Sequence, residues 1–216
     1  MPKYPIDLIL FDLDGTLTDS IPPAITSIQA MLNDEGFPLK DRKLIASYVG
    51  FGEKYLVSES IGSKDEKDIA RATKSYYKHY SNEGIQLVKL YPHVKDLLEK
   101  VKNKILIIIS NKRDEFIVKI VENLGINSYF REIYGGDSSP CLKPEPCLVL
   151  SLLEKYDVPA NRALFVGDMT IDIHTAKNSG IHACAVTYGF DSKEKLAAEK
   201  PDFMVDDIMK ITDFIE

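Results

Sequence analysis

The chain has 216 residues, a formal net charge of −6, 44% hydrophobic residues and 28% charged residues. This composition is typical of a globular protein that is long enough to bury a sizeable core. The sequence contains no basic stripe that would favour nucleic acid, and no apolar stretch of the roughly 20 residues that a membrane span needs.

Short apolar runs alternate with helical patterns along the chain, which favours a parallel sheet covered by helices on both faces. The run ILIII is almost uniformly apolar and β-branched, as expected for a strand buried on both sides. The predicted strands, in chain order, are residues 6–12, 105–110, 132–134, 163–168, 183–187 and 203–205. The predicted fold class is therefore α/β, with a Rossmann-like, doubly wound parallel sheet.

The first two predicted strands are separated by about ninety residues, far more than the few tens of residues in a usual crossover. The intervening sequence has helical patterns. One begins near Pro22 and Pro23 and ends at Gly36, and a second covers residues 64–84. A further helix at residues 92–102 leads back to the sheet. The predicted domains are a catalytic core, residues 1–16 and 87–216, and an inserted helical cap domain, residues 17–86.

Acidic residues recur at the ends of two predicted strands. Asp12 and Asp14 follow the first strand, Asp168 ends the run ALFVGD, and Asp172 lies four residues further on. Ligands of doubly wound sheets bind at the carboxyl ends of the strands, where these side chains would converge. Four neighbouring carboxylates need a positive counter-charge, and an all-oxygen ligand set favours Mg²⁺.

Complementary groups follow the other strands. Ser110 and Asn111 come after ILIII and can donate hydrogen bonds to an anion, while Lys143 lies in the proline-rich stretch CLKPEP. Each feature also has an ordinary structural interpretation, as a turn, a helix N-cap or a surface lysine. Their common placement at strand ends favours a phosphate-handling site, in which a carboxylate can attack phosphorus.

Four motifs occur in one order: DLDGT, SN, the lysine of KPEP, and GDMTID. In these motifs, and along essentially the whole chain, the sequence resembles phosphatases of the haloacid dehalogenase superfamily, in particular the phosphoglycolate phosphatase-like branch. The resemblance implies a Rossmann-like core with an α-helical cap inserted after the first motif, which agrees with the pattern above.

The resemblance also implies catalytic roles. Asp12 is the nucleophile that forms an aspartyl-phosphate, and Asp14 is the general acid and then the general base. Ser110 and Asn111 hold the phosphoryl oxygens, and Lys143 neutralises the phosphate and orders Asp12.

The implied Mg²⁺ ligands are Asp12, the backbone carbonyl of Asp14, and Asp168, with Asp172 as an outer-shell or water-mediated ligand. Thr16 is grouped with the phosphate-binding residues, as a support for the first-motif loop.

The expected activity is hydrolysis of small phosphomonoesters, with phosphoglycolate as the first candidate. The presence of Asp14 argues against dehalogenases, which lack an acid there. A pyrophosphatase, a nucleotide or sugar-phosphate phosphatase, and, from another class, a receiver-like phosphoacceptor module remain alternatives. The cap stretch GFGEKY at residues 50–55 is the candidate loop over the site, with Lys54 either binding a substrate carboxylate or lying on the surface.

The three cysteines, Cys141, Cys147 and Cys184, form neither an even framework nor a C-x-x-C motif. We therefore expect free or buried thiols and a cytoplasmic location. The expected partner is a small phosphorylated metabolite, with no nucleic acid and no membrane, and the expected assembly is a monomer or a homodimer.

Overall fold

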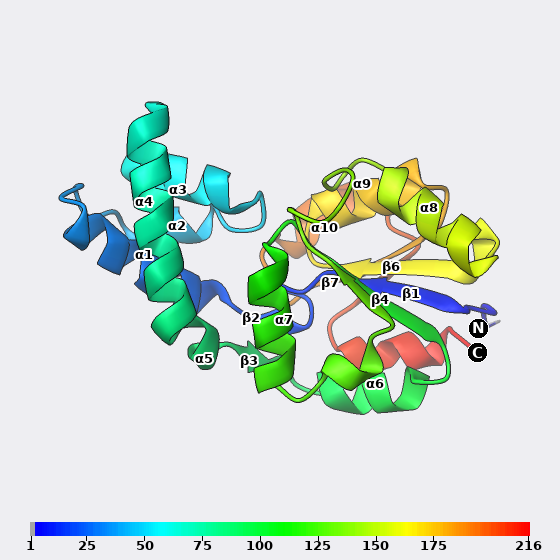
Figure 1. The fold of residues 1–216 in the computed structure, drawn as a ribbon. Coiled ribbons are helices and arrows are strands. Elements are labelled where there is room, and N and C mark those ends of the chain that lie inside the picture. Colours follow the sequence, from blue (N-terminus) through cyan, green and yellow to red (C-terminus); the bar gives the residue numbers. More distant parts are fainter. Residues whose placement is uncertain (1–2) are drawn as a thin grey trace.

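A computed structural model describes residues 3–216 of the chain. Its centre is a six-stranded parallel sheet with the strand order β5-β4-β1-β6-β7-β8 (Figure 1). The strands are β1 (Leu8–Phe11), β4 (Ile105–Ile109), β5 (Glu132–Tyr134), β6 (Ala163–Gly167), β7 (His182–Val186) and β8 (Phe203–Val205). The chain adds strands on one side of β1 and then on the other, so the predicted doubly wound α/β class is confirmed.

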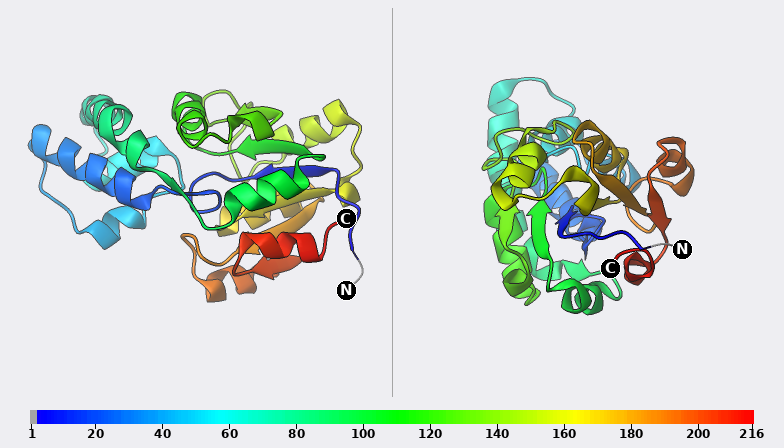
Figure 2. Two further views of the ribbon diagram at one scale, coloured as in Figure 1. Left: turned by 90° about the horizontal axis from the view of Figure 1, so that it is seen from below. Right: turned by 90° about the vertical axis from the view of Figure 1, so that its right-hand side faces the viewer.

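Side chains of successive strand residues point to opposite faces of the sheet, and each face packs on its own layer of helices (Figure 2). On β1, Ile9 and Phe11 belong to one hydrophobic cluster, whereas Leu8 and Leu10 belong to the other. The first cluster includes residues of α6 (Val94–Val101), α7 (Asp114–Asn123) and the 3₁₀ helix η4 (Ile208–Asp213). The second includes residues of α8 (Cys147–Tyr156), α9 (Thr170–Asn178) and α10 (Lys193–Ala198).

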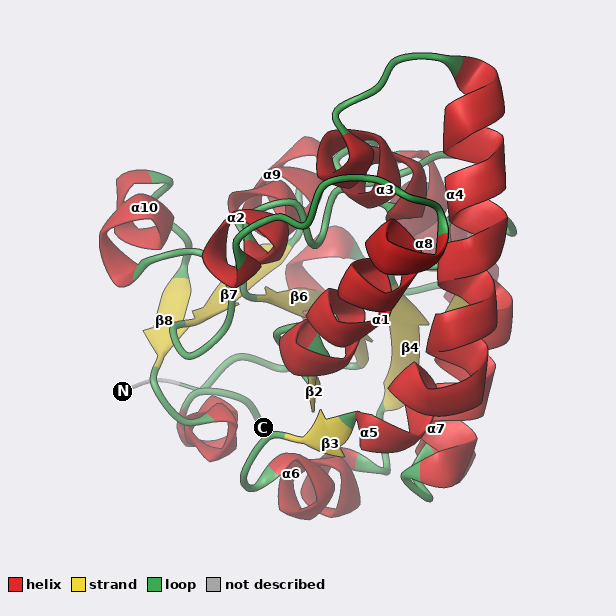
Figure 3. Ribbon diagram, turned by 90° about the vertical axis from the view of Figure 1, so that its left-hand side faces the viewer, coloured by secondary structure: helices red, strands yellow, loops and turns green. Residues whose placement is uncertain are grey.

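A group of helices inserted between β1 and β4 lies at the carboxyl ends of the strands (Figures 1 and 3). Its members are α1 (Ile21–Asp34), α2 (Arg42–Ala46), α3 (Glu53–Ile61), α4 (Glu66–His79), the π-helical turn η1 (Tyr80–Gly84) and α5 (Ile85–Leu87). We call this group the cap. The α-helical insertion is as predicted, and the domain limits at residues 16/17 and 86/87 stay a prediction.

Several local elements differ from the predicted ones. The candidate loop at residues 50–55 is a loop only as far as Gly52, because the short helix α3 begins at Glu53. The helix predicted for residues 64–84 ends at His79, and the chain continues through the π-turn η1. A Cβ atom on Gly84 would lie 2.7 Å from the Tyr80 ring, so this turn depends on a close approach that only glycine permits.

The two passages between core and cap form a small antiparallel ribbon. Strand β2 (Thr18–Asp19) pairs with β3 (Lys89–Leu90), and the first cap helix, α1, begins two residues after Asp19. Two-residue strands are too short to produce a recognisable alternation of apolar residues, which explains why the sequence did not predict them.

The prediction of free thiols is wrong for two of the three cysteines. Cys141 and Cys147 form a disulfide, whereas Cys184 is free and buried, as predicted. The turn between the two cysteines brings their Cα atoms to 6.2 Å, within the usual range for a disulfide, and a spacing of six residues alone does not show this. Among residues 3–216, no helix combines the length and the apolar character that a membrane crossing requires.

Candidate active site

The predicted site residues converge at the carboxyl edge of the sheet, around β1. This strand pairs with β4 on one side and with β6 on the other, so the residues that follow the three strands are neighbours. Asp12 and Asp14 follow β1, Ser110 follows β4 and Asp168 follows β6. All four are buried, with Asp168 completely inaccessible to solvent. The order of the strands therefore places these polar groups inside the protein at the switch point of the sheet.

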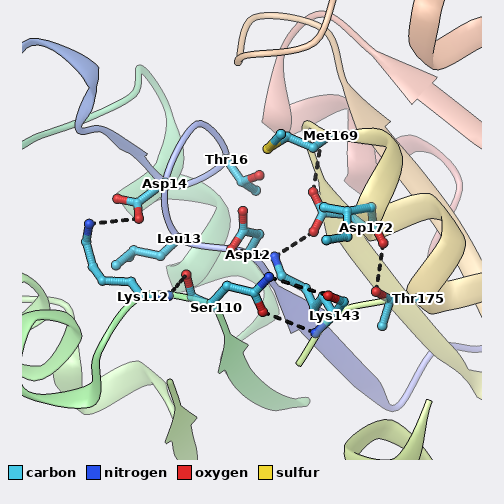
Figure 4. A network of polar contacts seen from close by, with 12 residues as sticks. Asp12, Leu13, Asp14, Thr16, Ser110, Lys112, Lys143, Met169, Asp172 and Thr175 are labelled. Atoms are coloured by element: carbon cyan, nitrogen blue, oxygen red, sulfur yellow. Dashed lines mark hydrogen bonds and ion pairs between the residues drawn. The ribbon is translucent and has the colours of Figure 1, made fainter. Parts of the chain in front are cut away.

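Lys143 reaches the same place from the loop before α8. Its Nζ lies 2.8 Å from Asp12 Oδ1 and 2.7 Å from Asp172 Oδ1 (Figure 4). The Asn111 side chain fixes this loop, because its Oδ1 accepts a hydrogen bond of 3.1 Å from the Lys143 backbone N–H. Burial alone would lower the pKa of Lys143, but the Asp12 and Asp172 carboxylates outweigh burial and raise it. Lys143 is therefore a fixed positive charge beside Asp12.

Three carboxylates form a cluster that can hold a cation. One oxygen from each of Asp12, Asp168 and Asp172 lies within 4.8 Å of the other two, and all three residues are buried. Burial raises the pKa of Asp12 to about 7 and the pKa of Asp168 well above its ordinary value, and the neighbouring carboxylates add to both effects. The single positive charge of Lys143 therefore does not balance the negative charge of the three carboxylates. A bound cation would do so, and the hard carboxylate oxygens fit Mg²⁺. The Asp14 side chain is not a member of this cluster.

Thr16 and Gly15 hold Asp168 in position. Thr16 is fully buried, and its Oγ1 donates a hydrogen bond of 2.8 Å to Asp168 Oδ1. The backbone N–H of Phe190 donates to the other carboxylate oxygen at 2.7 Å. Gly15 has a φ of +85°, and a Cβ atom there would lie 2.2 Å from Asp168 Oδ2. Thr16 therefore contacts a predicted metal ligand, which fits its predicted role as a support for the loop.

Asp14 lies on the side of Asp12 that faces away from Asp172, and it pairs with Lys112 (Figure 4). Lys112 Nζ is 3.0 Å from Asp14 Oδ2, and both side chains are buried. Within residues 3–216, Asp14 Oδ1 has no hydrogen-bond partner. Lys112 directly follows the SN motif but was not predicted as a site residue, because a single lysine in a sequence carries no signal of its burial.

The cap forms one side of a cavity above these residues. The cavity has a volume of about 30 Å³, and its lining includes Asp12, Asp14, Lys112 and, from the cap helix α3, Glu53. Glu53 accepts hydrogen bonds from the Arg113 backbone N–H at 3.2 Å and from Tyr77 Oη at 3.0 Å, and burial raises its pKa.

Glu53 was not predicted as a site residue either, and the candidate from this stretch was the next residue, Lys54. The Lys54 side chain is 71% exposed, pairs with Glu66 on α4 and does not line the cavity. The structure thus gives Lys54 the surface position that was the alternative interpretation.

Comparison with known proteins agrees with this geometry. Residues 9–186 match the sequence profile of the haloacid dehalogenase-like hydrolase family. The chain belongs to this family. It is 34% identical to a phosphoglycolate phosphatase of Vibrio parahaemolyticus, over 100% of this chain and 98% of the relative, and 35% identical to one of Aliivibrio fischeri, over 94% and 93%. The crystal structure of a predicted phosphoglycolate phosphatase from Haemophilus somnus superimposes with a TM-score of 0.90 at 31% identity, over 96% of this chain and 97% of that one.

The region that matches the family includes most of the fold. The match begins in β1 and ends in β7, so it includes the acids, the cap and the Lys143 loop. The protein is thus a haloacid dehalogenase-like hydrolase, and the relatives at this level of identity carry the names of phosphatases.

Proposed function

We propose that the protein is a Mg²⁺-dependent phosphomonoester hydrolase that converts 2-phosphoglycolate to glycolate and phosphate. One observation carries the chemistry: two buried carboxylates one residue apart face different partners. Asp12 contacts Lys143, whereas Asp14 contacts Lys112. Such a difference in surroundings suits two carboxyl groups with different tasks. The names of the relatives support the choice of substrate.

In the proposed first step, a carboxylate oxygen of Asp12 attacks phosphorus and the bond from phosphorus to the glycolate oxygen breaks. Asp14 donates its proton to that oxygen, so glycolate leaves as an alcohol and Asp12 carries an acyl phosphate. In the second step, Asp14, now ionised, removes a proton from a water molecule that attacks the phosphoryl group. Phosphate leaves, and both aspartates return to their starting forms.

The remaining residues position the phosphoryl group. Ser110 and Asn111 lie at the end of β4 and line the same cavity, where they can donate to the phosphoryl oxygens. Lys143 supplies a positive charge beside Asp12. Asp12, Asp168 and Asp172, with the backbone carbonyl of Asp14, would hold Mg²⁺. When bound, Mg²⁺ neutralises phosphate charge and so favours attack by an anionic carboxylate.

The cap side of the cavity favours a small leaving group. Ala24, Val49 and Leu56 form apolar walls around the cap side of the cavity. A sugar or nucleoside would need a different arrangement of these walls, whereas glycolate is among the smallest alcohols of metabolism. Pyrophosphate is the main alternative because its leaving group is also small and anionic.

A substrate panel tests this proposal. The values of kcat/KM are compared for phosphoglycolate, pyrophosphate, a sugar phosphate, a nucleoside monophosphate and an aryl phosphate, each with Mg²⁺. We expect phosphoglycolate to rank first, and a rank well below the others would refute the proposed substrate. Sustained release of phosphate from the aryl ester separates an enzyme from a receiver-like module, which would accept phosphate without turnover.

Removal of Mg²⁺ with a chelator should abolish activity, and its re-addition should restore it. Persistent turnover in excess chelator would refute the proposed cofactor.

The cytoplasmic location and the monomeric or homodimeric state also stay predictions. The Cys141–Cys147 disulfide argues against a strongly reducing setting, where such bonds are rare.

A further inference from the structure

Lys112 is a buried cation that takes no part in the steps described above. It follows β4, is 8% exposed and lines the cavity between core and cap. Its Nζ lies 3.0 Å from Asp14 Oδ2, so it is immediately beside the proposed proton donor. A lysine in this position is far from solvent and needs a reason to be there, since burying an ammonium group without sufficient partners is costly.

Lys112 has a second neighbour besides Asp14, and one oxygen of Asp14 stays unpaired. The ammonium group lies 4.8 Å from the centre of the Tyr80 ring. Among residues 3–216, Asp14 Oδ1 is buried, belongs to a residue that lines the cavity and has no hydrogen-bond partner. Buried polar atoms are normally paired, so an unpaired oxygen beside a buried cation indicates that a polar ligand completes this environment.

The chemistry of phosphoglycolate places its second anion at this point. A proton donor must lie within about 2.6–3.2 Å of the oxygen that it protonates, so the ester oxygen lies next to Asp14. The carboxylate carbon of phosphoglycolate is only two covalent bonds from that oxygen. Because Lys112 Nζ is already in contact with Asp14, it can reach this carboxylate without a large movement.

We propose that Lys112 binds the second anionic group of the substrate, the carboxylate of the leaving alcohol, and so determines specificity for esters with a charged leaving group. This inference rests on the proposed function, because it takes Asp14 as the proton donor. Glu53 also lines the cavity, but it is an acid, and its two oxygens already accept hydrogen bonds from the Arg113 N–H of the core and from Tyr77 Oη of the cap. Of the described residues that line the cavity, Lys112 is the one with a positively charged side chain.

The test compares two esters that differ only in this second group. Phosphoglycolate carries a carboxylate where 2-hydroxyethyl phosphate carries a neutral CH₂OH group. The ratio of their kcat/KM values is measured for the wild type, Lys112→Met and the matched control Lys119→Met. Lys119 lies on the exposed surface of α7 and pairs there with Glu115. The ratio within one variant cancels losses that affect both esters equally, such as partial unfolding or a displaced Asp14.

We expect Lys112→Met to reduce the preference for phosphoglycolate by about 10–100-fold, as expected for the loss of a hydrogen bond to a charged group in a closed cavity. Lys119→Met should keep the wild-type ratio. An unchanged ratio in Lys112→Met, with both esters slowed equally, would show that Lys112 only positions Asp14 and would overturn the proposal. A loss of preference in Lys54→Met instead would assign the role to the cap lysine and overturn it as well.

Two further measurements keep the outcome decisive. If Lys112→Met turns over neither ester, the affinities for both esters are measured by calorimetry in Asp12→Asn and in Asp12→Asn/Lys112→Met, because binding needs no turnover. If Lys112→Met does not fold, Lys112→Gln takes its place. Pyrophosphate is included as a second source of anionic leaving group. If the wild type shows no preference for phosphoglycolate over either reference, the proposed substrate fails, whereas a wild-type preference that survives in the Lys112 variants refutes only the role of Lys112.

Discussion

Gly15→Ala gives a direct test of how the first-motif loop positions the metal site. The structure places the new methyl group 2.2 Å from Asp168 Oδ2 and 2.6 Å from its Cγ. Ordinary contacts begin near 3.4 Å, so the carboxylate must move by about 1 Å. Such a movement disrupts the hydrogen bonds from Thr16 Oγ1 and the Phe190 N–H. A displacement of this size in a predicted ligand should reduce kcat/KM by about 100-fold.

Gly36→Ala is the matched control because it imposes the same backbone strain without the collision. Gly36 has a φ of +73°, close to the +85° of Gly15, and a Cβ atom there would meet no atom within 4 Å. An alanine in the left-handed region costs roughly 1–2 kcal/mol, which lowers the melting temperature of a protein of this size by about 2–8 °C. We expect this loss of stability in both variants, and a further loss in Gly15→Ala, where bonds to a buried carboxylate are worth about 1.5–3 kcal/mol each.

The assay combines thermal denaturation with steady-state kinetics, each at several Mg²⁺ concentrations. Gly36→Ala should have wild-type activity and a wild-type stabilisation by Mg²⁺. Gly15→Ala should need more Mg²⁺ for half-maximal activity and should gain less stability from it. If Gly15→Ala keeps kcat/KM within about threefold of Gly36→Ala, then the position of Asp168 does not limit catalysis.

Three further predictions address single side chains. Asp12→Asn should abolish turnover while the melting curve stays cooperative, and substantial remaining activity would exclude Asp12 as the nucleophile. Asp14→Asn should slow the reaction by roughly 10²–10⁴-fold, because an amide is a poor proton donor; a change below tenfold would assign that task elsewhere. Burial would raise the pKa of Glu132, but hydrogen bonds from Lys155 and Tyr156 outweigh burial and lower it to about 2. A lowered pKa stabilises the fold at pH values above the ordinary pKa of a glutamate, and this stabilisation disappears as the pH falls through 2. Glu132→Gln should therefore reduce the free energy of unfolding by on the order of 1 kcal/mol at neutral pH and leave it unchanged near pH 2, as measured by urea denaturation across the pH range.

The sequence contains enough information to predict the sheet and the residues at its carboxyl edge. Apolar runs such as ILIII are long enough to identify strands, and the strand order of a doubly wound sheet places Asp12, Ser110 and Asp168 together. Their spacing on the chain is uninformative by itself. They become a site because β1 lies between β4 and β6.

The features that the sequence did not predict depend on contacts between distant segments. Lys112 lies in the loop before α7, and Glu53 lies on the cap helix α3. Both are buried, and neither belongs to a motif that would indicate burial. The Cys141–Cys147 disulfide depends on a turn that brings the two residues together. Periodicity reports which face of an element is buried, but it does not report which polar side chains meet there.

The cavity between core and cap also bears on how a substrate would enter. Its volume of about 30 Å³ leaves too little room for phosphoglycolate, so the proposed function requires the cap to move away from the core before the substrate binds. We expect this movement to separate Glu53 from the Arg113 N–H, a contact that joins α3 to the loop after β4. The chain passes between core and cap at β2 and β3, so these two segments are where the cap would hinge. If the proposed function holds, the Glu53 contact breaks and forms again in every turnover, and motion of the cap is part of the cycle.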